Sequence, residues 1–341
     1  MNSLSPTKRA EPGDLLCSQF DMAGGSVPGR RHIGCGNLLA GKNNQDAIGF
    51  YACDDMLVIT VHDGCGSTPY SEFGARLAAN IIPAAIREAA GKDRHEQIDK
   101  QAFWQQVQQI ALSRFAAIAS LCCSNQMSLN SESNFARQHL LFTILGALIT
   151  KDLTVVFGMG DGVFAINGKA TTIGPFPDNA PDYLCKPLIS TADAPDFVLH
   201  ARIRTEKLES LILGTDGVQD LISSASKRIP GKSRSVGTLT DLLKQDFLFS
   251  NFSEDGIESA PLDSLTGWLR QINSEVTKQC LDEEGAPIIK REEGLLPDDT
   301  TIVALRRQIR SSSALQSTST ALKNTETTVH PTENTSRPKI F

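Results

Sequence analysis

The segment Met56-Leu-Val-Ile-Thr-Val-His62-Asp63-Gly64-Cys-Gly66 runs from apolar and β-branched residues into an aspartate that is followed by glycine. The apolar part predicts a buried β-strand over Met56–His62, since β-branched side chains pack well on a pleated sheet. The Asp-Gly pair predicts a tight turn after it, because glycine adopts backbone angles that other residues avoid. The segment therefore predicts a strand that presents the Asp63 carboxylate at the rim of a sheet.

Four further segments place an aspartate in the same setting, at the end of an apolar strand or in the turn beyond it. They are Asn44-Gln-Asp46, Gly158-Met-Gly-Asp161-Gly162, Leu213-Gly-Thr-Asp216-Gly-Val-Gln-Asp220 and Pro297-Asp298-Asp299-Thr-Thr301. Taken singly, Asp-Gly after a strand is ordinary turn chemistry. Five such segments together indicate a cage of oxygen ligands, which Mg²⁺ and Mn²⁺ prefer. Their wide separation along the chain leaves open whether they meet in space.

The pattern of apolar residues predicts a mixed α/β protein. Strands are expected at Ala47–Cys53, Met56–His62, Leu140–Ile149, Leu153–Gly158, Val163–Asn167, Phe197–Arg204, Ser210–Gly214 and Thr301–Leu305. Helices are expected at Glu72–Ala90, Ile98–Leu121, Val218–Ser223, Thr238–Leu248 and Leu262–Leu281, followed by a loop over Asp282–Leu296. Many of the strands are separated by only a few residues, which favours antiparallel pairing, because a parallel return needs a longer crossover.

The charge, the cysteines and the apolar runs of the chain argue against several classes of protein. A net charge of -6 argues against a sequence-independent grip on nucleic acid, although a local basic patch is compatible with it. The eight cysteines form no CxxC pair, which argues against a zinc site and a disulfide framework and favours reduced thiols in a cytoplasmic protein. No signal peptide is evident, and no apolar run is long enough to cross a membrane.

Both ends of the chain differ from the middle in composition. Residues 1–25 are rich in Pro, Gly and Ser, and residues 311–341 are rich in Ser, Thr and Asn with few large apolar groups. Such segments do not bury enough apolar surface to offset the loss of conformational entropy on folding. We therefore expect a flexible N-terminal segment over 1–25, one folded domain over 26–310, and a disordered tail over 311–341.

The order of the aspartate motifs resembles the metal-dependent protein phosphatases of the protein phosphatase 2C (PPM) family, above all its bacterial members. The resemblance runs from about Gly34 to Arg306 and also includes Phe142-Thr143 before the Gly160-Asp161-Gly162 turn. It implies an α+β fold in which two packed antiparallel β-sheets are flanked by α-helices. It also implies two Mg²⁺ or Mn²⁺ ions, with a weaker third site, at one end of the cleft between the sheets.

The resemblance assigns a role to each matched residue. Asp63 would bridge the two cations, the Gly64 carbonyl would bind the second, and Asp216 and Asp298 would bind the first. Asp46 would orient water on the cations. The third site would take Asp161 and Asp216, with Asp220 nearby. The reaction implied is hydrolysis of phosphoserine or phosphothreonine in proteins by a metal-activated water, without a covalent phosphoenzyme.

Three positions depart from the family pattern. Many relatives carry a phosphate-clamping arginine before the first motif, where this chain has Lys42; Arg30 and Arg31 are alternatives for that role. Cys65 replaces a histidine of the animal relatives, and the neighbouring His62 should point away from Asp63 along an alternating strand. Gln45 replaces a glutamate, which removes one negative charge beside the second cation.

The substrate expected is a phosphorylated protein, a kinase or a target of one, acted on by a monomer that binds neither nucleic acid nor membranes. One alternative is a catalytically weak or silent module of the same fold that binds a phosphoprotein partner. Another is a different two-metal hydrolase, such as a phosphodiesterase or nuclease, which the acidic composition disfavours.

Overall fold

Two five-stranded antiparallel sheets form the centre of the protein. The structure is a computed structural model, which describes residues 16–33, 41–91, 97–124, 130–177, 181–249, 264–281 and 284–308. The first sheet has the order β2 (Ala47–Ala52), β3 (Met56–His62), β4 (Ile144–Thr150), β5 (Leu153–Met159) and β8 (Val198–Arg204). The second has the order β1 (Phe20–Val27), β12 (Thr300–Arg307), β9 (Ser210–Gly214), β6 (Gly162–Ile166) and β7 (Lys169–Ile173).

Strand β3 shows why the sheets pack in layers. Every residue from Met56 to His62 is buried. Leu57, Ile59 and Val61 join a core that also takes side chains from β9 and β12 of the other sheet. Met56 and Val58 alternate with them and pack into a different core, against helices. A strand that is buried on both faces needs apolar residues at both sets of alternate positions, as this one has.

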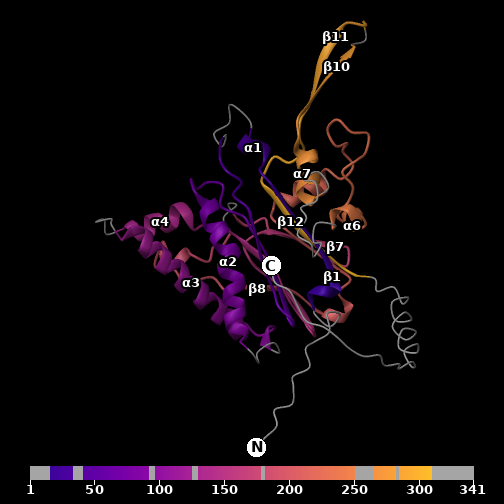
Figure 1. The fold of residues 1–341 in the computed structure, drawn as a ribbon. Helices are drawn as coiled ribbons and strands as arrows, with labels where there is room; N and C mark the ends of the chain where they lie inside the picture. Colours follow the sequence, from indigo (N-terminus) through magenta and orange to yellow (C-terminus); the bar gives the residue numbers. More distant parts are fainter. Residues whose placement is uncertain are drawn as a thin grey trace, which may run out of the picture. The chain divides into compact units, whose positions relative to one another are not determined.

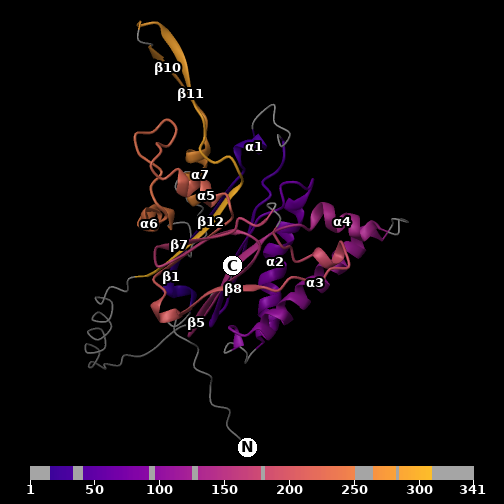
Figure 2. The same ribbon diagram turned by 180° about the vertical axis from the view of Figure 1, so that it is seen from behind.

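Helices cover the outer face of each sheet (Figures 1 and 2). The first sheet carries α2 (Ser71–Ala90), α3 (Gln101–Cys123) and α4 (Ser131–His139), whose apolar residues complete its outer core. The second carries α5 (Val218–Ser223), α6 (Leu239–Leu243) and α7 (Leu265–Asn273). The predicted class, two packed antiparallel sheets flanked by helices, is confirmed. None of the helices in the described part of the chain is long and apolar enough to cross a membrane.

Part of the segment predicted to be flexible is a strand. Residues 20–25 belong to β1, which pairs with β12 from Phe20↔Arg307 to Val27↔Thr300. The glycines that suggested flexibility serve close packing instead. A Cβ at Gly25 would lie 2.7 Å from the backbone nitrogen of Thr266, so only glycine lets α7 approach the strand this closely. Residues 1–15 and the tail predicted over 311–341 lie outside the described residues.

The predicted helix Leu262–Leu281 and the loop Asp282–Leu296 are also corrected. The helix α7 ends at Asn273, and β10 (Val276–Leu281) pairs with β11 (Pro287–Glu292) in a two-stranded hairpin that projects from the rest of the domain (Figure 1). Val276-Thr-Lys-Gln-Cys-Leu alternates half-buried and exposed residues. A short alternating run of this kind favours a strand when a partner strand follows it closely.

Smaller differences concern lengths and elements that the pattern missed. The strand predicted from Leu140 begins only at Ile144, and the helix Thr238–Leu248 is α6 followed by a 3₁₀ turn over Asp246–Leu248. The helices α1 (Arg30–Ile33) and α4 and the strand β7 were not predicted. Strand β7 is exposed along most of its length, so it lacks the apolar alternation that marks a strand in sequence.

Candidate metal centre

One cavity of about 270 Å³ collects carboxylates from both sheets. Asp63 follows β3 of the first sheet, whereas Asp216 follows β9 and Asp298 precedes β12 of the second. Asp161 lies in the turn between β5 and β6, which carries the chain from one sheet to the other. All four line the cavity, together with Gly64. The structure therefore brings these residues together, although their chain positions are far apart.

The carboxylates of this cavity repel one another in a poorly solvated place. Burial raises the pKa of Asp63 well above its usual value, and the negative charges of Asp46, Asp216, Asp298 and Asp161 raise it further. Burial likewise raises the pKa of Asp216 to about 6, with repulsion from Asp298 and Asp161 adding to it. A group of buried like charges is costly unless a cation compensates it. The donor set therefore fits hard divalent cations.

Asp46 lies behind the cavity wall rather than on it. One of its carboxylate oxygens accepts a hydrogen bond from Thr215 Oγ1 at 2.8 Å. The other, Oδ1, is buried and has no hydrogen-bond partner within the described residues. Burial and the charge of Asp299 raise the pKa of this carboxyl. An orphaned carboxylate oxygen is an acceptor for a water molecule or a cation.

Asp220 lies in the first turn of α5, close to the cavity but not on its wall. Burial raises the pKa of its carboxyl, and the charge of Asp298 adds to the effect while Arg31 opposes it. Within the described residues, no three His, Cys, Asp or Glu side chains are already closed around one point as in a finished metal site. An open arrangement suits cations that keep several water ligands, as Mg²⁺ does.

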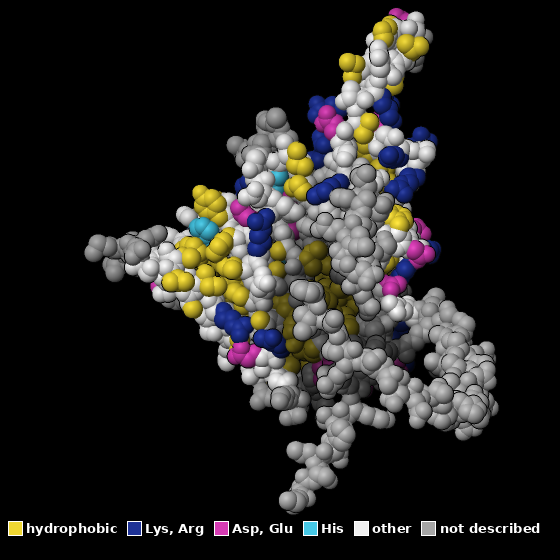
Figure 3. Space-filling view, in the orientation of Figure 1, with side chains coloured by type: hydrophobic (Ala, Val, Ile, Leu, Met, Phe, Trp, Pro, Cys, Tyr) yellow, Lys and Arg dark blue, Asp and Glu magenta, His cyan; other side chains and the backbone are white. Residues whose placement is uncertain are grey.

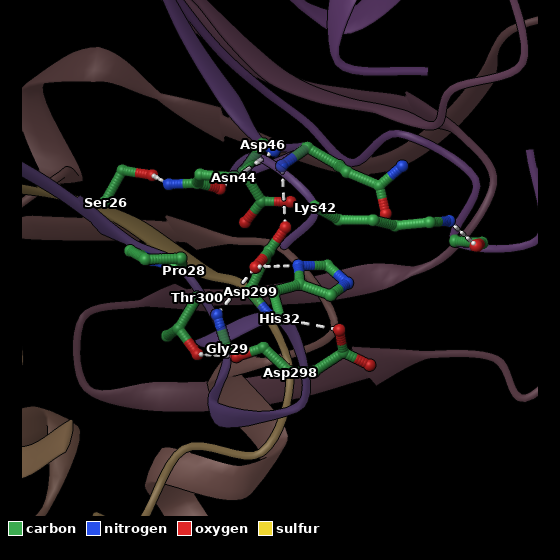
Figure 4. A network of polar contacts seen from close by, with 12 residues as sticks. Ser26, Pro28, Gly29, His32, Lys42, Asn44, Asp46, Asp298, Asp299 and Thr300 are labelled. Carbon is green, nitrogen blue, oxygen red and sulfur yellow. Dashed lines mark hydrogen bonds and ion pairs between the residues drawn. The ribbon is translucent and has the colours of Figure 1, made fainter. Parts of the chain in front are cut away.

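Asp299, which was expected only as the second residue of a motif, organises the wall of the cavity (Figure 4). Its Oδ1 accepts from the Gly29 backbone N–H at 2.6 Å and lies 2.8 Å from Nδ1 of the buried His32. Its Oδ2 accepts from the Gln45 backbone N–H at 2.6 Å. A Cβ at Gly29 would lie 2.4 Å from the backbone of Asp298, which leaves room only for glycine. Asp299 thereby ties the segment after β1 to the first acidic motif and to β12.

Lys42 does not line the cavity. Its ammonium donates to the carbonyls of Gly66 at 2.6 Å and Thr68 at 3.1 Å, and it lies apart from Asp298 in Figure 4. Arg31 lines the cavity instead, and its guanidinium has no hydrogen-bond partner within the described part of the chain. The spacing to the first motif did not single out Arg31, because it is the position of α1, with the Arg31 N–H donating to the Pro297 carbonyl at 3.1 Å, that holds this residue at the cavity.

His62 is a structural residue, as the alternation of β3 predicted. Its ring is fully buried, its Nε2 lies 2.8 Å from Thr60 Oγ1, and burial lowers its pKa to about 3. Cys65 lines the cavity, with its Sγ 3.1 Å from Ser67 Oγ. Tyr183, which sequence reasoning missed, also lines the cavity, and burial raises the pKa of its hydroxyl. Tyr183 lies in an irregular segment without a motif, so no pattern could have identified it.

Comparisons with known proteins place the chain in a family. The family model described as protein phosphatase 2C matches residues 33–270. Solved structures with a similar course of the chain include a sex-determining protein of C. elegans (12% identity, 84% of this chain and 64% of that chain covered, TM-score 0.47). The serine/threonine phosphatase Stp1 from Staphylococcus aureus is another (13% identity, 85% and 96% covered, TM-score 0.45). So is the phosphatase PstP/Ppp of Mycobacterium tuberculosis (13% identity, 85% and 99% covered, TM-score 0.42).

This chain thus spans about two thirds of the C. elegans structure and nearly all of the two bacterial ones. A search of curated proteins found no match. The family model covers most of the folded chain, including four of the five aspartate motifs. The chain therefore belongs to the protein phosphatase 2C family and, by that membership, to the protein serine/threonine phosphatases.

Proposed function

We propose that this protein hydrolyses phosphoserine and phosphothreonine in other proteins with a water activated at a binuclear Mg²⁺ or Mn²⁺ centre. The observation that carries the proposal is the convergence of Asp63, Asp161, Asp216 and Asp298 on one cavity, where their negative charges repel one another. A PstP catalytic domain has been solved in complex with two manganese ions. The substrate would be a phosphoprotein, a kinase or a kinase target, and we expect the enzyme to act in the cytoplasm as a monomer.

In this proposal the carboxylates divide into direct ligands and supporting groups. Asp63 would bridge both cations, the Gly64 carbonyl would bind one, and Asp216 and Asp298 would bind the other. Asp46 would hold water through its orphaned oxygen, and Asp161, Asp216 and Asp220 would form a weaker third site. When bound, the cations would lower the pKa of a water molecule and neutralise charge on the phosphoryl group.

The phosphate group needs a cation from the chain itself, and we propose Arg31 for that role. Its guanidinium lies on the cavity wall without a hydrogen-bond partner among the described residues. A guanidinium matches two phosphate oxygens at once, whereas the ammonium of Lys42 is held by two backbone carbonyls. We expect Arg31→Ala to raise KM for a phosphopeptide by roughly tenfold or more, given the strength of charge-assisted hydrogen bonds. Lys42→Ala should change KM far less; the reverse order would assign the phosphate to Lys42.

The deciding experiment measures Mn²⁺-dependent phosphate release from p-nitrophenyl phosphate and from a phosphothreonine peptide. The parent is compared with Asp63→Asn and Asp216→Asn, each of which removes one negative charge from the cavity. The matched control is Asp193→Asn, which alters an exposed carboxylate outside the lining of the cavity. Activity in the parent and the control, with loss of about 100-fold or more in both cavity variants, supports the proposal. A parent protein that is inactive and binds no Mn²⁺ would contradict the proposed function.

A further inference from the structure

A second and larger cavity, of about 1230 Å³, lies at the root of the β10–β11 hairpin. Its walls come from the end of β1, from α1, from the end of α7 and from residues at the base of the hairpin. The charged residues that line it are Arg30, Arg31, Arg270, Arg291, Glu275 and Glu293. We call this cavity the arginine groove.

The groove is basic on a protein that is acidic as a whole. Four arginines face two glutamates there, whereas the chain carries a net charge of -6. Figure 3 shows Lys and Arg side chains gathered around the base of the hairpin. A concave surface of one sign attracts a ligand of the opposite sign and raises its local concentration.

The arginines of the groove do not all have the same freedom. Arg30 contacts Glu275 at 3.1 Å, and Arg291 contacts the same carboxylate at 2.5 Å. This triplet connects α1 to β11 through Glu275, the residue before β10, and the Glu275 carboxylate is paired with two arginines. The guanidinium groups of Arg31 and Arg270 have no hydrogen-bond partner in the described part of the chain, and both residues are exposed. Among the described residues, none hydrogen-bonds to these two guanidinium groups, and both can bind an anion.

The groove adjoins the carboxylate cavity, because Arg31 lines both of them. A substrate chain whose phosphorylated residue reaches Arg31 can therefore run on beside Arg270 and the root of the hairpin, which line the adjoining groove. An extended chain advances about 3.3 Å per residue, so residues a few positions from the phosphorylated one can reach the groove.

We propose that the arginine groove binds acidic residues that flank the phosphorylated residue of the substrate protein. This inference rests on the proposed phosphatase function and adds to that function a preference for the sequence around the phosphorylated residue. The occupant is a Glu- or Asp-rich segment of the same substrate chain, held by Arg270 and oriented by the wall that the Arg30–Glu275–Arg291 triplet builds. Pairs between partly exposed charges weaken with salt, so the preference is a property of moderate ionic strength.

The test compares two phosphothreonine peptides of equal length, one with glutamates on both sides of the phosphothreonine and one with glutamines there. We expect the parent to show a kcat/KM about three- to tenfold higher for the glutamate peptide at low salt, as a few exposed charge pairs would provide. High salt should abolish the difference. Arg270→Gln should reduce the ratio about two- to threefold, and Arg270→Glu should abolish or invert it.

The matched control is Arg202→Glu, which makes the same charge change on the exposed part of β8, away from both cavities. The ratio should stay at the parent value in that variant, and the thermal unfolding midpoints of all variants show whether they fold. The proposed role of the groove would be wrong if the parent hydrolysed both peptides equally, or if Arg202→Glu lost the preference as Arg270→Glu does. Either result would leave the proposed phosphatase function intact.

Binding of non-phosphorylated fluorescent peptides tests the arginine groove separately from the phosphatase function, because binding needs no catalysis. Arg270-dependent and salt-sensitive binding of the glutamate peptide supports the groove even if no phosphate is released. Tighter binding of a single-stranded oligonucleotide of the same net charge would contradict the assignment to an acidic polypeptide.

Discussion

At the scale of single residues, Asp299 holds together parts of the chain that lie far apart in sequence. It accepts hydrogen bonds from Gly29 and Gln45 and contacts His32, all in a buried place. Removal of a buried acceptor leaves its donors unsatisfied, at about 1–3 kcal/mol for each such group. Asp299 therefore matters for the shape of the cavity rather than for its charge alone.

We predict that Asp299→Ala lowers the free energy of unfolding by about 2–5 kcal/mol, because several buried donors lose their acceptor together. Urea unfolding measures this loss. Asp193→Ala is the control, since that carboxylate is exposed, and it should stay within about 0.5 kcal/mol of the parent. An Asp299→Ala variant as stable as the parent would show that water replaces the carboxylate at no cost.

The raised pKa of Asp216 gives a second prediction at this scale. Burial raises the pKa of Asp216 in the folded state to about 6 from its usual value of 3.8. In protein treated with a chelator, the protonated form favours the folded state below about pH 4, and this contribution is lost as the pH rises through about 6. Asp216→Asn removes the effect.

We therefore expect the stability of Asp216→Asn relative to the parent to increase by on the order of 2 kcal/mol from about pH 4 to pH 7 when cations are chelated. Urea unfolding at several pH values measures the difference. Saturating Mn²⁺ should reverse the order at pH 7, because only the parent retains the full set of carboxylates. A pH-independent difference would contradict the raised pKa.

At the scale of elements, the contact between β1 and α7 depends on one glycine. A Cβ at Gly25 would lie 2.7 Å from Thr266 N and 2.8 Å from the backbone carbon of Leu265. At the adjacent Gly24 the nearest atom is the end of the flexible Ile48 side chain, at 3.3 Å. The two neighbouring positions in one strand thus differ in whether backbone or side chain must move.

We predict that Gly25→Ala costs about 2 kcal/mol or more of stability, since α7 must shift, whereas Gly24→Ala stays within about 0.5 kcal/mol of the parent. Thermal and urea unfolding of the two variants measure this contrast. Equal effects at both positions would mean that the close approach of α7 to β1 is not needed for stability.

At the scale of the whole molecule, the proposed cations would connect the two sheets, because Asp63 extends the first and Asp216 and Asp298 belong to the second. A ligand that binds only the folded state stabilises it by about 2.7 kcal/mol at 100 times its dissociation constant. We predict that Mn²⁺ raises the thermal midpoint of the parent by several degrees and has little effect on Asp63→Asn. Differential scanning fluorimetry measures both. An equal rise in the two proteins would place the stabilising cation elsewhere.

Much of the fold was predictable because buried strands carry their own signal. The strands β3, β5, β6 and β9 coincide with the predicted apolar runs to within a residue or two. The hairpin β10–β11 and the strand β7 were not predicted, since exposed strands need a partner rather than an apolar face. The strand β1 was missed because its glycines indicate flexibility in sequence and permit close packing in the fold.

The sequence by itself determined that five aspartate motifs follow or precede buried strands, and therefore that an oxygen-rich metal centre was the leading hypothesis. Only the tertiary structure decided which groups share the cavity: Asp63, Asp161, Asp216 and Asp298 line it, Asp46 stands behind it, and Arg31 rather than Lys42 is the cation on its wall. The physical reason is that a strand pattern fixes where a carboxylate leaves a sheet. The packing of two sheets and the hydrogen bonds of the loops between them fix where that carboxylate, or a nearby cation, comes to rest.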